Sequence, residues 1–444
     1  MQPPSRRTGA GFTALHLVQP VEGGVAQVVL DLVTAQVDAG FRVVVGCPGA
    51  GPLAGAAAVR GAEVHPWRAT RAPGAGVVRE VREAARLVRA VRPDLLHAHS
   101  AKAGLAGRLA VRGRVPTVFQ PHAWSFEAAH GVTARLARGW ERWAVRWTDR
   151  VLCVSEAERR TGERAGIEAA WSVVRNGVDL VRFHPPAPEP VPAPGPATAA
   201  AAPGSADPAA AYPVAVGLAA SGPAASGPPA AAPDAAHPAE GLAAARAGLP
   251  LLAGVPDGAP VVLCVGRLCP QKGQDILLRA WPSVVRRFPA ARLVLAGDGP
   301  DAAALCAAAP PSVLFAGAVP DTAPWYRAAD LVVLPSRWEG MAVAPLEAMA
   351  SGRAVVLSDV DGARESLPPG APASCLVPPE DPAALAGALG ALLADRPLRE
   401  AVGRLSLRHV RDGYDVRETA RAVTDVYRSV AAVPRPGRGE AIPQ

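Results

Sequence analysis

The chain has 444 residues, half of them apolar and about a fifth charged, which excludes a wholly disordered protein and exceeds the length of one ordinary domain. Its formal net charge of +7 is concentrated in residues 1–184, which hold 25 Lys and Arg against 15 Asp and Glu. No stretch approaches the roughly 18 uninterrupted apolar residues of a membrane span, and the N-terminus lacks the apolar core of a signal peptide. The six cysteines form no CxxC pair. We therefore expect a cytoplasmic protein with reduced thiols.

Continuous apolar runs alternate with helical periods along residues 1–184. Runs that are apolar at almost every position indicate strands buried on both faces of a parallel sheet. The predicted strands cover 14–18, 42–46, 94–99, 116–120 and 150–154, and the predicted helices cover 25–39, 76–92, 101–112 and 133–148. This pattern predicts a Rossmann-like domain.

Residues 185–245 break the alternation. They contain no Lys or Arg, and Ala and Pro dominate their composition. Proline at this density prevents regular hydrogen bonding, and little apolar surface remains to offset the entropy of ordering the chain. We predict a disordered insertion that separates two domains.

The second half repeats the first pattern. The predicted strands cover 260–266, 292–297, 312–317, 330–335 and 354–358, and the predicted helices cover 272–288, 322–329, 341–352, 381–394 and 397–411. Residues 246–412 are therefore expected to form a second domain, and 413–444 a helix that packs back on the first domain, followed by a disordered tail. The predicted fold is α/β, with two Rossmann-like doubly wound parallel-sheet domains facing a cleft. Ligands should bind at the carboxyl ends of the strands.

A basic pair marks the end of the first strand of the second domain. Arg267 directly follows strand 260–266, and Lys272 stands where the next helix opens. Fixed cations beside the free backbone N–H groups of a helix start can bind a diphosphate. Because many loops carry Arg and Lys by chance, the pair alone indicates no more than surface charge.

Two glutamates follow the strand at 330–335. Glu339 stands at the strand-to-helix turn, and Glu347 is expected about two turns into the helix. The unpaired N–H groups of Gly340 to Val343 would lie between the two carboxylates. Carboxylates accept hydrogen bonds from sugar hydroxyls, so the arrangement suits a ligand with a hexose, a ribose and phosphates between them. Apolar neighbours make an unpaired charge on Glu347 unfavourable, which favours a functional role.

Several motifs now stand in order. They are VGRLCPQKGQD (265–275), LVLAGDGP (293–300), the AD and PS pairs of 329–336, Glu339 with Glu347, and Gly362 with Glu365. Together they resemble the donor domain of the retaining GT-B glycosyltransferases of family 4, also called glycosyl transferases group 1. The resemblance implies that Arg267 and Lys272 hold a nucleotide diphosphate, that Glu347 binds the ribose hydroxyls and that Glu339 faces the transferred sugar.

One departure from the family bears on the donor. Met341 and Ala342 follow Gly340, where the family commonly has Phe-Gly or Leu-Pro. Because this loop touches the sugar in the family, the donor is left open. A UDP-sugar is favoured, and GDP-mannose comes next.

The first domain also resembles the family. Gly23 and Gly24 follow the first strand, like the family's glycine-rich loop, and VSEAERR (154–160) and RNGVD (175–179) match as well. His122 follows strand 116–120 and matches the family's cleft histidine, which contacts the donor sugar. A neutral imidazole there could donate to a sugar hydroxyl or stabilise developing positive charge. A buried structural histidine is the alternative.

Two groups of residues have side chains that could bind a metal ion. His97 and His99 flank a strand end but have no evident third ligand, so hydrogen-bonded polar residues are the preferred interpretation. Asp359 and Asp361 form an Asp-x-Asp, yet they belong to the segment of the Gly362–Glu365 motif. We predict no metal ion and no cofactor, because the basic pair and helix-start amides can stabilise the leaving diphosphate.

Helix 133–148 bears on a membrane partner. Leu136, Trp140, Trp143 and Trp147 fall on one side of a helical wheel, beside a stripe of arginines. Tryptophan next to arginine suits a membrane interface, although such a face is more often packed into a core. With the basic first domain, this pattern suggests peripheral attachment to the inner face of an anionic membrane; no nucleic acid is expected to bind.

These observations predict a metal-independent retaining glycosyltransferase. It would move a hexose or N-acetylhexosamine from a nucleotide diphosphate sugar to a lipid-linked or cell-surface polysaccharide or glycolipid acceptor. The alternatives are an epimerase or phosphorylase of the same architecture and a catalytically silent sugar-nucleotide-binding or scaffold protein. The expected catalytic residues are His122, Glu339, Arg267 and Lys272, and the expected donor-binding residues are Gly23, Gly24, Arg267, Lys272, Glu339, Gly340, Met341, Ala342, Val343 and Glu347.

Overall fold

Parallel strands form the first sheet of the protein, for which a computed structural model describes residues 11–70, 74, 76–186 and 238–433. Within those residues the sheet has seven strands, all in parallel register. In spatial order they are β3 (Glu63–Pro66), β2 (Arg42–Cys47), β1 (Thr13–Val18), β4 (Leu95–His99), β5 (Thr117–Gln120), β6 (Arg150–Cys153) and β7 (Trp171–Val173). The order reverses between β1 and β4, which places ligand sites at the carboxyl ends of these strands.

Helices cover both faces of this sheet. They are α1 (Gly23–Asp38), α2 (Pro52–Val59), α3 (Val77–Val91), α4 (Ser100–Val111), α5 (Gly131–Ala144) with the 3-10 turn η1 (Val145–Trp147), and α6 (Glu156–Arg164). Buried side chains of α1 and α2 pack on one face, and those of α3 and α4 pack on the other. The central strands β1 and β4 are buried along their whole length, as their continuous apolar runs predict.

The second sheet has six parallel strands among the described residues. In spatial order they are β10 (Val313–Gly317), β9 (Arg292–Ala296), β8 (Val261–Val265), β11 (Leu331–Leu334), β12 (Ala354–Ser358) and β13 (Leu376–Val377). Its helices are α7 (Pro238–Ala247), α8 (Gln274–Arg287), α9 (Ala302–Ala308), α10 (Ala323–Ala328), α11 (Ala344–Ala350), α12 (Ala363–Ser366), α13 (Pro382–Ala394) and α14 (Arg396–Gly413), with 3-10 turns η2 (Pro250–Leu252), η3 (Pro270–Lys272) and η4 (Ala373–Cys375). The two predicted Rossmann-like sheets are confirmed.

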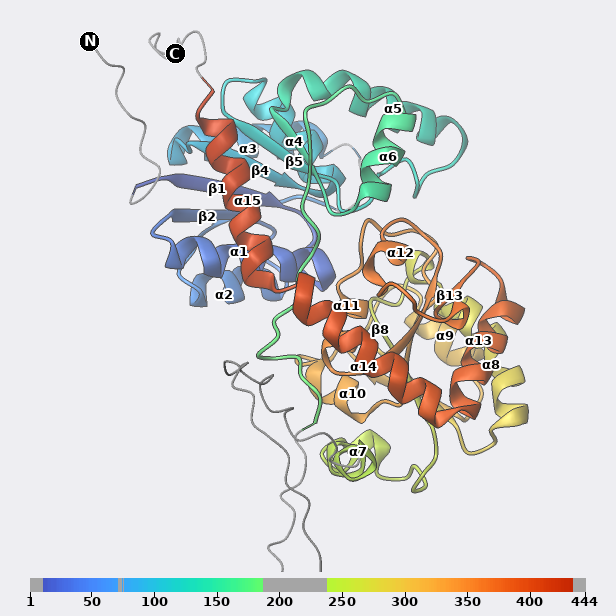
Figure 1. Ribbon diagram of the computed structural model, residues 1–444. Helices are drawn as coiled ribbons and strands as arrows, with labels where there is room; N and C mark the ends of the chain where they lie inside the picture. The colour runs from blue at the N-terminus through green and yellow to red at the C-terminus, as the bar shows by residue number, and fades with distance from the viewer. Residues whose placement is uncertain (1–10, 71–73, 75, 187–237, 434–444) are drawn as a thin grey trace, which may run out of the picture.

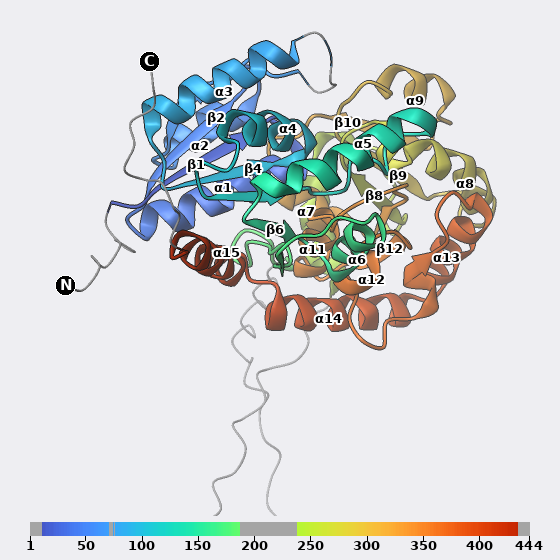
Figure 2. The ribbon, with the colours of Figure 1, turned by 90° about the horizontal axis from the view of Figure 1, so that it is seen from above.

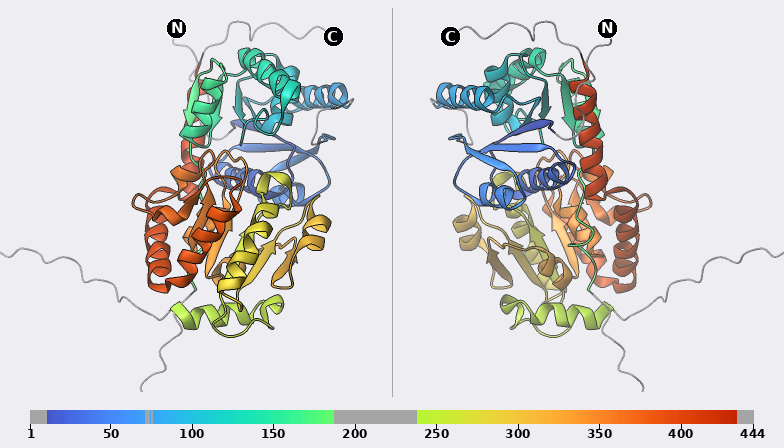
Figure 3. Two further views of the ribbon diagram at one scale, coloured as in Figure 1. Left: turned by 90° about the vertical axis from the view of Figure 1, so that its right-hand side faces the viewer. Right: turned by 90° about the vertical axis from the view of Figure 1, so that its left-hand side faces the viewer.

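The last helix returns to the first domain. Helix α14 packs against α11 of the second domain, whereas α15 (Val416–Ala431) packs against α1 of the first. Figures 1 and 2 show the two helices following one another along one side of the molecule, and Figure 3 shows α15 beside the upper sheet. The chain crosses between the domains at Val178, whose N–H donates to Tyr414 O at 2.8 Å and whose carbonyl accepts from Val416 N at 3.1 Å.

Several sequence expectations need correction. Helix α7 lies partly inside the segment predicted to be disordered; its alanine-rich sequence favours a helix, and Arg246 ties its end to Asp330. The helix predicted over 341–352 covers only Ala344–Ala350, and the helix predicted over 133–148 ends at Ala144. Edge strands β3, β7 and β13 were missed because they are short and lack an apolar run. The rest of the predicted insertion (187–237) and the tail (434–444) lie outside the described residues.

The structure bears on the predicted thiols and on the predicted absence of a membrane span. All six cysteines are described and none forms a disulfide; Cys306 is exposed and the others are buried. Within the described residues, no helix combines the length and the apolar character that crossing a membrane requires.

Candidate functional site

The basic pair and the first glutamate meet at the carboxyl ends of β8 and β11. Lys272, in η3, forms an ion pair with Glu339 through Oε1, and Ser336 Oγ donates to the same oxygen at 2.9 Å. Glu339 is only 9% exposed, so its charge depends on these partners. Gln271 Nε2 donates to Trp338 O at 3.1 Å and fixes the two loops to one another.

Arg267 stands beside this pair on a tightly packed turn. Gly297 has φ +149°, and a Cβ there would lie 2.0 Å from Gly266 O, so the loops after β8 and β9 lie backbone against backbone. Only glycine allows this approach. The Arg267 side chain is half-buried, and among the described residues it makes one weak hydrogen bond, to Cys269 Sγ at 3.4 Å. Its remaining donors face no acceptor among the described residues.

Glu347 lies in the first turn of α11, not two turns into a helix as predicted, because α11 begins only at Ala344. The hydroxyl of Tyr326 donates to Glu347 Oε2 at 2.8 Å. Tyr326 is fully buried on α10. Burial raises the pKa of Glu347, and the Tyr326 hydrogen bond opposes that rise. Glu339 and Glu347 thus lie on either side of the turn at 340–343, each with a partner that the sequence did not reveal.

The turn from Gly340 to Val343 is held by hydrogen bonds and apolar contacts with the first domain. Ser155 Oγ donates to Gly340 O at 2.8 Å, and Asn176 Nδ2 donates to Met341 O at 2.7 Å. Val343 is buried in the apolar cluster of the first domain and lies 3.7 Å from where a Cβ of Gly24 would stand. Ala342 is half-buried. The predicted glycine loop and the predicted donor turn are therefore in contact.

The glycine loop itself opens helix α1. Gly23 has φ +74° and begins the helix, and a Cβ on it would meet no atom within 4 Å. The open space above Gly23 and the positive φ fit a loop that a ligand can approach closely.

Glu365, from the predicted Gly362–Glu365 motif, joins the domains as well. Its carboxylate accepts from the backbone N–H groups of Glu156 at 3.0 Å and Ala157 at 2.8 Å, at the start of α6 in the other domain. An acid at this position satisfies the free N–H groups of the helix and opposes its dipole. Arg175 pairs with the same carboxylate at 3.2 Å.

The predicted Asp-x-Asp has partners of its own. Asp361 accepts from Thr161 Oγ1 at 2.7 Å, and Asp359 pairs with Arg364. In the described part of the chain, neither aspartate belongs to a group of three side chains that could hold a metal ion.

His122 sits on an unusual stretch of backbone after β5. Both His122 and Ala123 have positive φ, +57° and +108°, which is rare for residues with a side chain. The Ala123 N–H donates to Glu158 Oε1 at 2.7 Å and holds the turn in place. Ala123 N would lie 3.0 Å from a Cβ on Gly340, so the turn faces residues 340–343 of the second domain. Burial lowers the pKa of His122 to about 3, which keeps its ring neutral.

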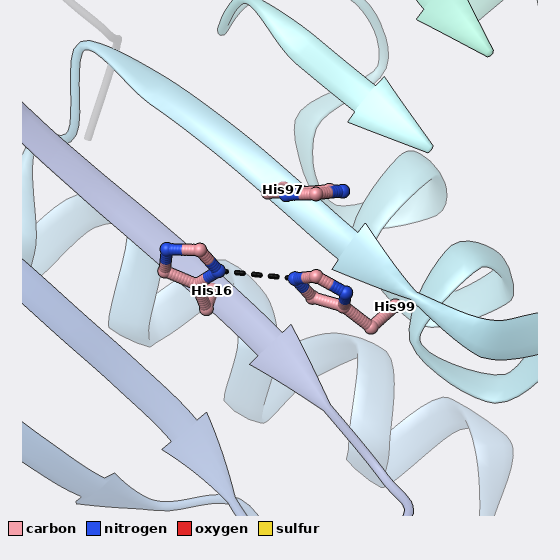
Figure 4. A group of neighbouring side chains, drawn as sticks. All are labelled: His16, His97 and His99. Carbon is pink, nitrogen blue, oxygen red and sulfur yellow. Dashed lines mark hydrogen bonds between the residues drawn. The ribbon is translucent and has the colours of Figure 1, made fainter. Parts of the chain in front are cut away.

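A cluster of buried histidines lies behind His122. Figure 4 shows His16 from β1 beside His97 and His99 from β4, and their ligand atoms lie within 4.8 Å of one another. His16 is a third possible ligand beside His97 and His99, contrary to the expectation from the sequence. His16 is separated in sequence but adjacent in the sheet, because β1 pairs with β4 and brings His16 opposite His97.

The Trp and Arg helix α5 is divided between core and surface. Leu136 is 69% exposed and Trp143 is 42% exposed, whereas Trp140 and Trp147 are half-buried. Trp143 and Trp147 pack edge to face. Figures 1 and 3 place α5 at the end of the first domain far from the second.

Asp31 brings a carboxylate from the first domain toward Glu347. It lies on α1, where Gln27 Nε2 donates to its Oδ1 at 2.7 Å. Burial raises the pKa of Asp31 to about 7, the Gln27 hydrogen bond lowers it, and the negative charge of Glu347 raises it further. Asp31 was not predicted, because an acid on an apolar helix carries no motif.

Other contributors were also missed. Tyr326, Ser155, Asn176 and Asp31 hold or face the predicted residues, yet none was assigned a role. Ser155 and Asn176 stand in the VSEAERR and RNGVD segments, whose resemblance to the family was the available signal. Tyr326 offered no signal, because its hydrogen bond depends on how α10 packs against α11.

The fold and these motifs have known counterparts. Residues 22–182 match the profile of Glycosyltransferase Family 4, and residues 259–395 match that of Glycosyl transferases group 1. The chain belongs to this family and is a glycosyltransferase of the GT-B fold.

Named relatives differ in the reactions that their names state. The lipopolysaccharide core biosynthesis mannosyltransferase LpcC of Rhizobium leguminosarum bv. viciae is 32% identical over 65% of this chain and 67% of its own length. The D-inositol 3-phosphate glycosyltransferase of Nocardia farcinica is 35% identical over 42% of this chain and 43% of its own. Among solved structures, Anabaena HepE in complex with UDP and glucose is 20% identical, covers 94% of this chain and 99% of its own, and has a TM-score of 0.70.

The raised pKa of Asp31 predicts a pH-dependent stability. The unfolded state loses its Asp31 proton near pH 4 and the folded state near pH 7, so wild-type stability falls as pH rises between these values. Asp31→Asn removes this loss. The free energy of unfolding of the variant minus that of wild type should therefore be larger at pH 8 than at pH 4.5, by at least about 1 kcal/mol, since one pKa unit corresponds to about 1.4 kcal/mol. Urea unfolding at both pH values measures it. Asp38→Asn, at an exposed position on α1, is the control, and an equal pH-dependent gain there contradicts the prediction.

Proposed function

We propose that this glycosyltransferase transfers a hexose or N-acetylhexosamine from a nucleotide diphosphate sugar, with retention, to a hydroxyl of a lipid-linked or cell-surface glycan. The observation that carries the proposal is the grouping of two cations and two carboxylates around the turn at 340–343. Two cations alone could bind many kinds of anion. Carboxylates on either side of the cations can in addition accept hydrogen bonds from hydroxyl groups at both ends of a diphosphate, as in a nucleotide diphosphate sugar.

Arg267 and Lys272 are the proposed diphosphate ligands. Arg267 has donors without acceptors in the described residues, and Lys272 has Glu339 as its counter-ion. A diphosphate accepts charge-assisted hydrogen bonds from both side chains, and the same bonds strengthen as negative charge develops on the leaving group. This charge stabilisation is the proposed reason that no divalent ion is required.

Glu347 and Glu339 are the proposed hydroxyl ligands. Glu347 would accept from the ribose hydroxyls while Tyr326 holds its other side. Glu339 would face the sugar, with Met341 and Ala342 shaping the pocket beside it. His122 and the Gly23–Gly24 loop approach the same turn from the first domain, so donor and acceptor would react between the domains.

The donor base is the finer point of the proposal. A UDP-sugar is favoured, and the crystallised complex of HepE with UDP and glucose is consistent with that choice. GDP-mannose is the second candidate, because LpcC is named a mannosyltransferase.

The acceptor is proposed to be reached at an anionic membrane surface. Leu136 and Trp143 are exposed on α5, and Arg135, Arg138, Arg142 and Arg146 are exposed around them. Apolar side chains among arginines can insert at the headgroup level while the guanidinium groups bind anionic lipid. The position of α5, away from the second domain, leaves this face open.

Glu347→Gln tests the donor site. The substitution preserves the side-chain shape and removes the charge, and we expect nucleotide binding to weaken roughly tenfold or more, since a hydrogen bond to a charged group contributes about 1.5–3 kcal/mol. Thermal shifts with UDP, GDP and ADP identify the preferred nucleotide and measure the loss.

The control is Glu418→Gln, the same substitution at an exposed position on α15. Equal nucleotide binding by the two variants contradicts the assigned role of Glu347. Release of nucleotide from the matching sugar donor separates an enzyme from a silent binding protein, which would bind without turnover.

Substituting Leu136 and Trp143 together by Glu tests the membrane surface. We expect roughly tenfold weaker co-sedimentation with phosphatidylglycerol-containing vesicles, because one buried apolar side chain contributes about 1.5–3 kcal/mol. Val59→Glu, at an 88% exposed valine on α2, is the control. Equal binding of wild type to phosphatidylcholine and phosphatidylglycerol vesicles removes the proposal.

A further inference from the structure

A continuous chain of hydrogen bonds runs from helix α1 to His122. Gln36 Oε1 lies 2.8 Å from His16 Nε2, and His16 Nδ1 lies 3.0 Å from His99 Nε2. His99 Nδ1 in turn lies 3.1 Å from His122 Nε2. Figure 4 shows the middle link as a dashed line. Gln36, His16 and His99 are fully buried, so water does not compete for these bonds.

The direction of the chain follows from the amide of Gln36. Its oxygen lies at His16, so its nitrogen is on the other side of the amide, where it has no hydrogen-bond partner among the described residues. The Gln36 side chain also lies near Tyr427: burial raises the pKa of Tyr427, and the Gln36 amide lowers it. The Tyr427 hydroxyl lies 2.6 Å from His97 Nδ1, which gives its proton an acceptor. The Gln36 oxygen that faces His16 can only accept.

Each ring in the chain therefore has one possible proton position. Burial lowers the pKa of His16 to about 4 and that of His99 well below its usual value, so both rings are neutral. A neutral imidazole has one N–H and one lone pair. His16 donates from Nε2 to Gln36 and accepts at Nδ1 from His99, and His99 accepts at Nδ1 from His122.

We propose that Gln36, His16 and His99 form a relay that fixes His122 as its Nε2–H tautomer and turns its Nδ1 lone pair to the cleft, where it accepts a hydrogen bond from a hydroxyl of the donor sugar. The last clause rests on the proposed function. His122 Nδ1 has no partner in the described part of the chain, and Ala123 beside it meets the donor turn. The role differs from the sequence expectation, in which the imidazole donates to a sugar hydroxyl or stabilises developing positive charge. Gln36, His16 and His99 are positioning residues.

The backbone holds the ring in the same orientation. The positive φ values of His122 and Ala123 are unfavourable for these residues, and the bond from Ala123 N to Glu158 stabilises them. The ring is thus fixed at Nε2 by His99 and at its base by a rigid turn. A lone pair held in this way needs no reorientation when a hydroxyl arrives.

A metal ion is the rival explanation of the histidine cluster. Three histidines within reach of one another are a common zinc ligand set. Here, however, His16 Nδ1 and His99 Nε2 already bond to one another, and the group contains no carboxylate to balance a divalent charge. All three rings are fully buried, where such a charge would be unfavourable. The relay accounts for the nitrogens of His16 and His99, and His97 Nδ1 bonds to Tyr427, whereas His97 Nε2 has no partner among the described residues.

Nitrogen-15 NMR of histidine-labelled protein tests the tautomers without any donor. We expect His16, His99 and His122 each to show a single Nε2–H form in wild type. His99→Phe removes the acceptor of His122 Nε2–H and should leave His122 as a mixture of tautomers. His97→Gln removes a buried ring from the same strand and face but keeps an amide oxygen that can accept from the Tyr427 hydroxyl, so the relay keeps its direction and His122 should keep one form.

Binding measurements test the effect on the sugar. With UDP-glucose and UDP, or GDP-mannose and GDP if wild type prefers them, His99→Phe should weaken binding of the sugar nucleotide roughly tenfold and leave that of the nucleotide unchanged, as for one lost hydrogen bond. His97→Gln should change neither. In a His122→Phe background, His99→Phe should cause no further loss, because the two residues act as one unit.

Four results overturn the relay. They are an Nδ1–H form of His122 in wild type, equal effects of His97→Gln and His99→Phe, additive losses in the double variant, and stoichiometric binding of Zn²⁺ that shifts the His16 and His99 signals. If wild type binds neither donor, the proposed function fails, and the tautomers measured on the protein alone still decide the relay.

Discussion

The contact between the turn at 340–343 and the first domain organises the rest of the structure. Ser155 and Asn176 donate to the carbonyls of Gly340 and Met341, and these side chains come from the other sheet. Because the turn stands between Glu339 and Glu347, the same bonds that join the domains also position the two carboxylates. Glu365 adds a reciprocal contact, since its carboxylate binds the start of α6. The contacts that hold the two domains together therefore also set the geometry of the site.

The electrostatics of the site follow from this packing. Glu339 and Glu347 are buried enough that each needs a partner, and Lys272 and Tyr326 supply them. Asp31 approaches from the first domain, where the charge of Glu347 adds to the effect of burial in raising its pKa. Carboxylates from both domains thus influence one another, and those of the second domain lie near the two cations proposed to bind a diphosphate.

One face of the first sheet carries buried polar side chains that are joined by hydrogen bonds. Strands β1 and β4 carry His16, His97 and His99 toward α1 and α15, where apolar residues would have packed more simply. Gln36 and Tyr427 come from those two helices and bond to His16 and His97, respectively. Because α15 follows the second domain in the chain, its docking on α1 links the end of the sequence to this cluster.

The sequence by itself determined the two parallel sheets, because strands buried on both faces leave continuous apolar runs, and it determined the chemical types at their carboxyl ends, Arg267, Lys272, Glu339 and Glu347. It also placed His122 at a strand end. Only the tertiary structure decided which groups face them: Tyr326 beside Glu347, Ser155 and Asn176 on the donor turn, and His16 beside His99. These pairs are separated in sequence and meet through helix packing, domain docking and strand register, respectively. Short edge strands and the late start of α11 escaped prediction for the same reason, since neighbours in space set their limits.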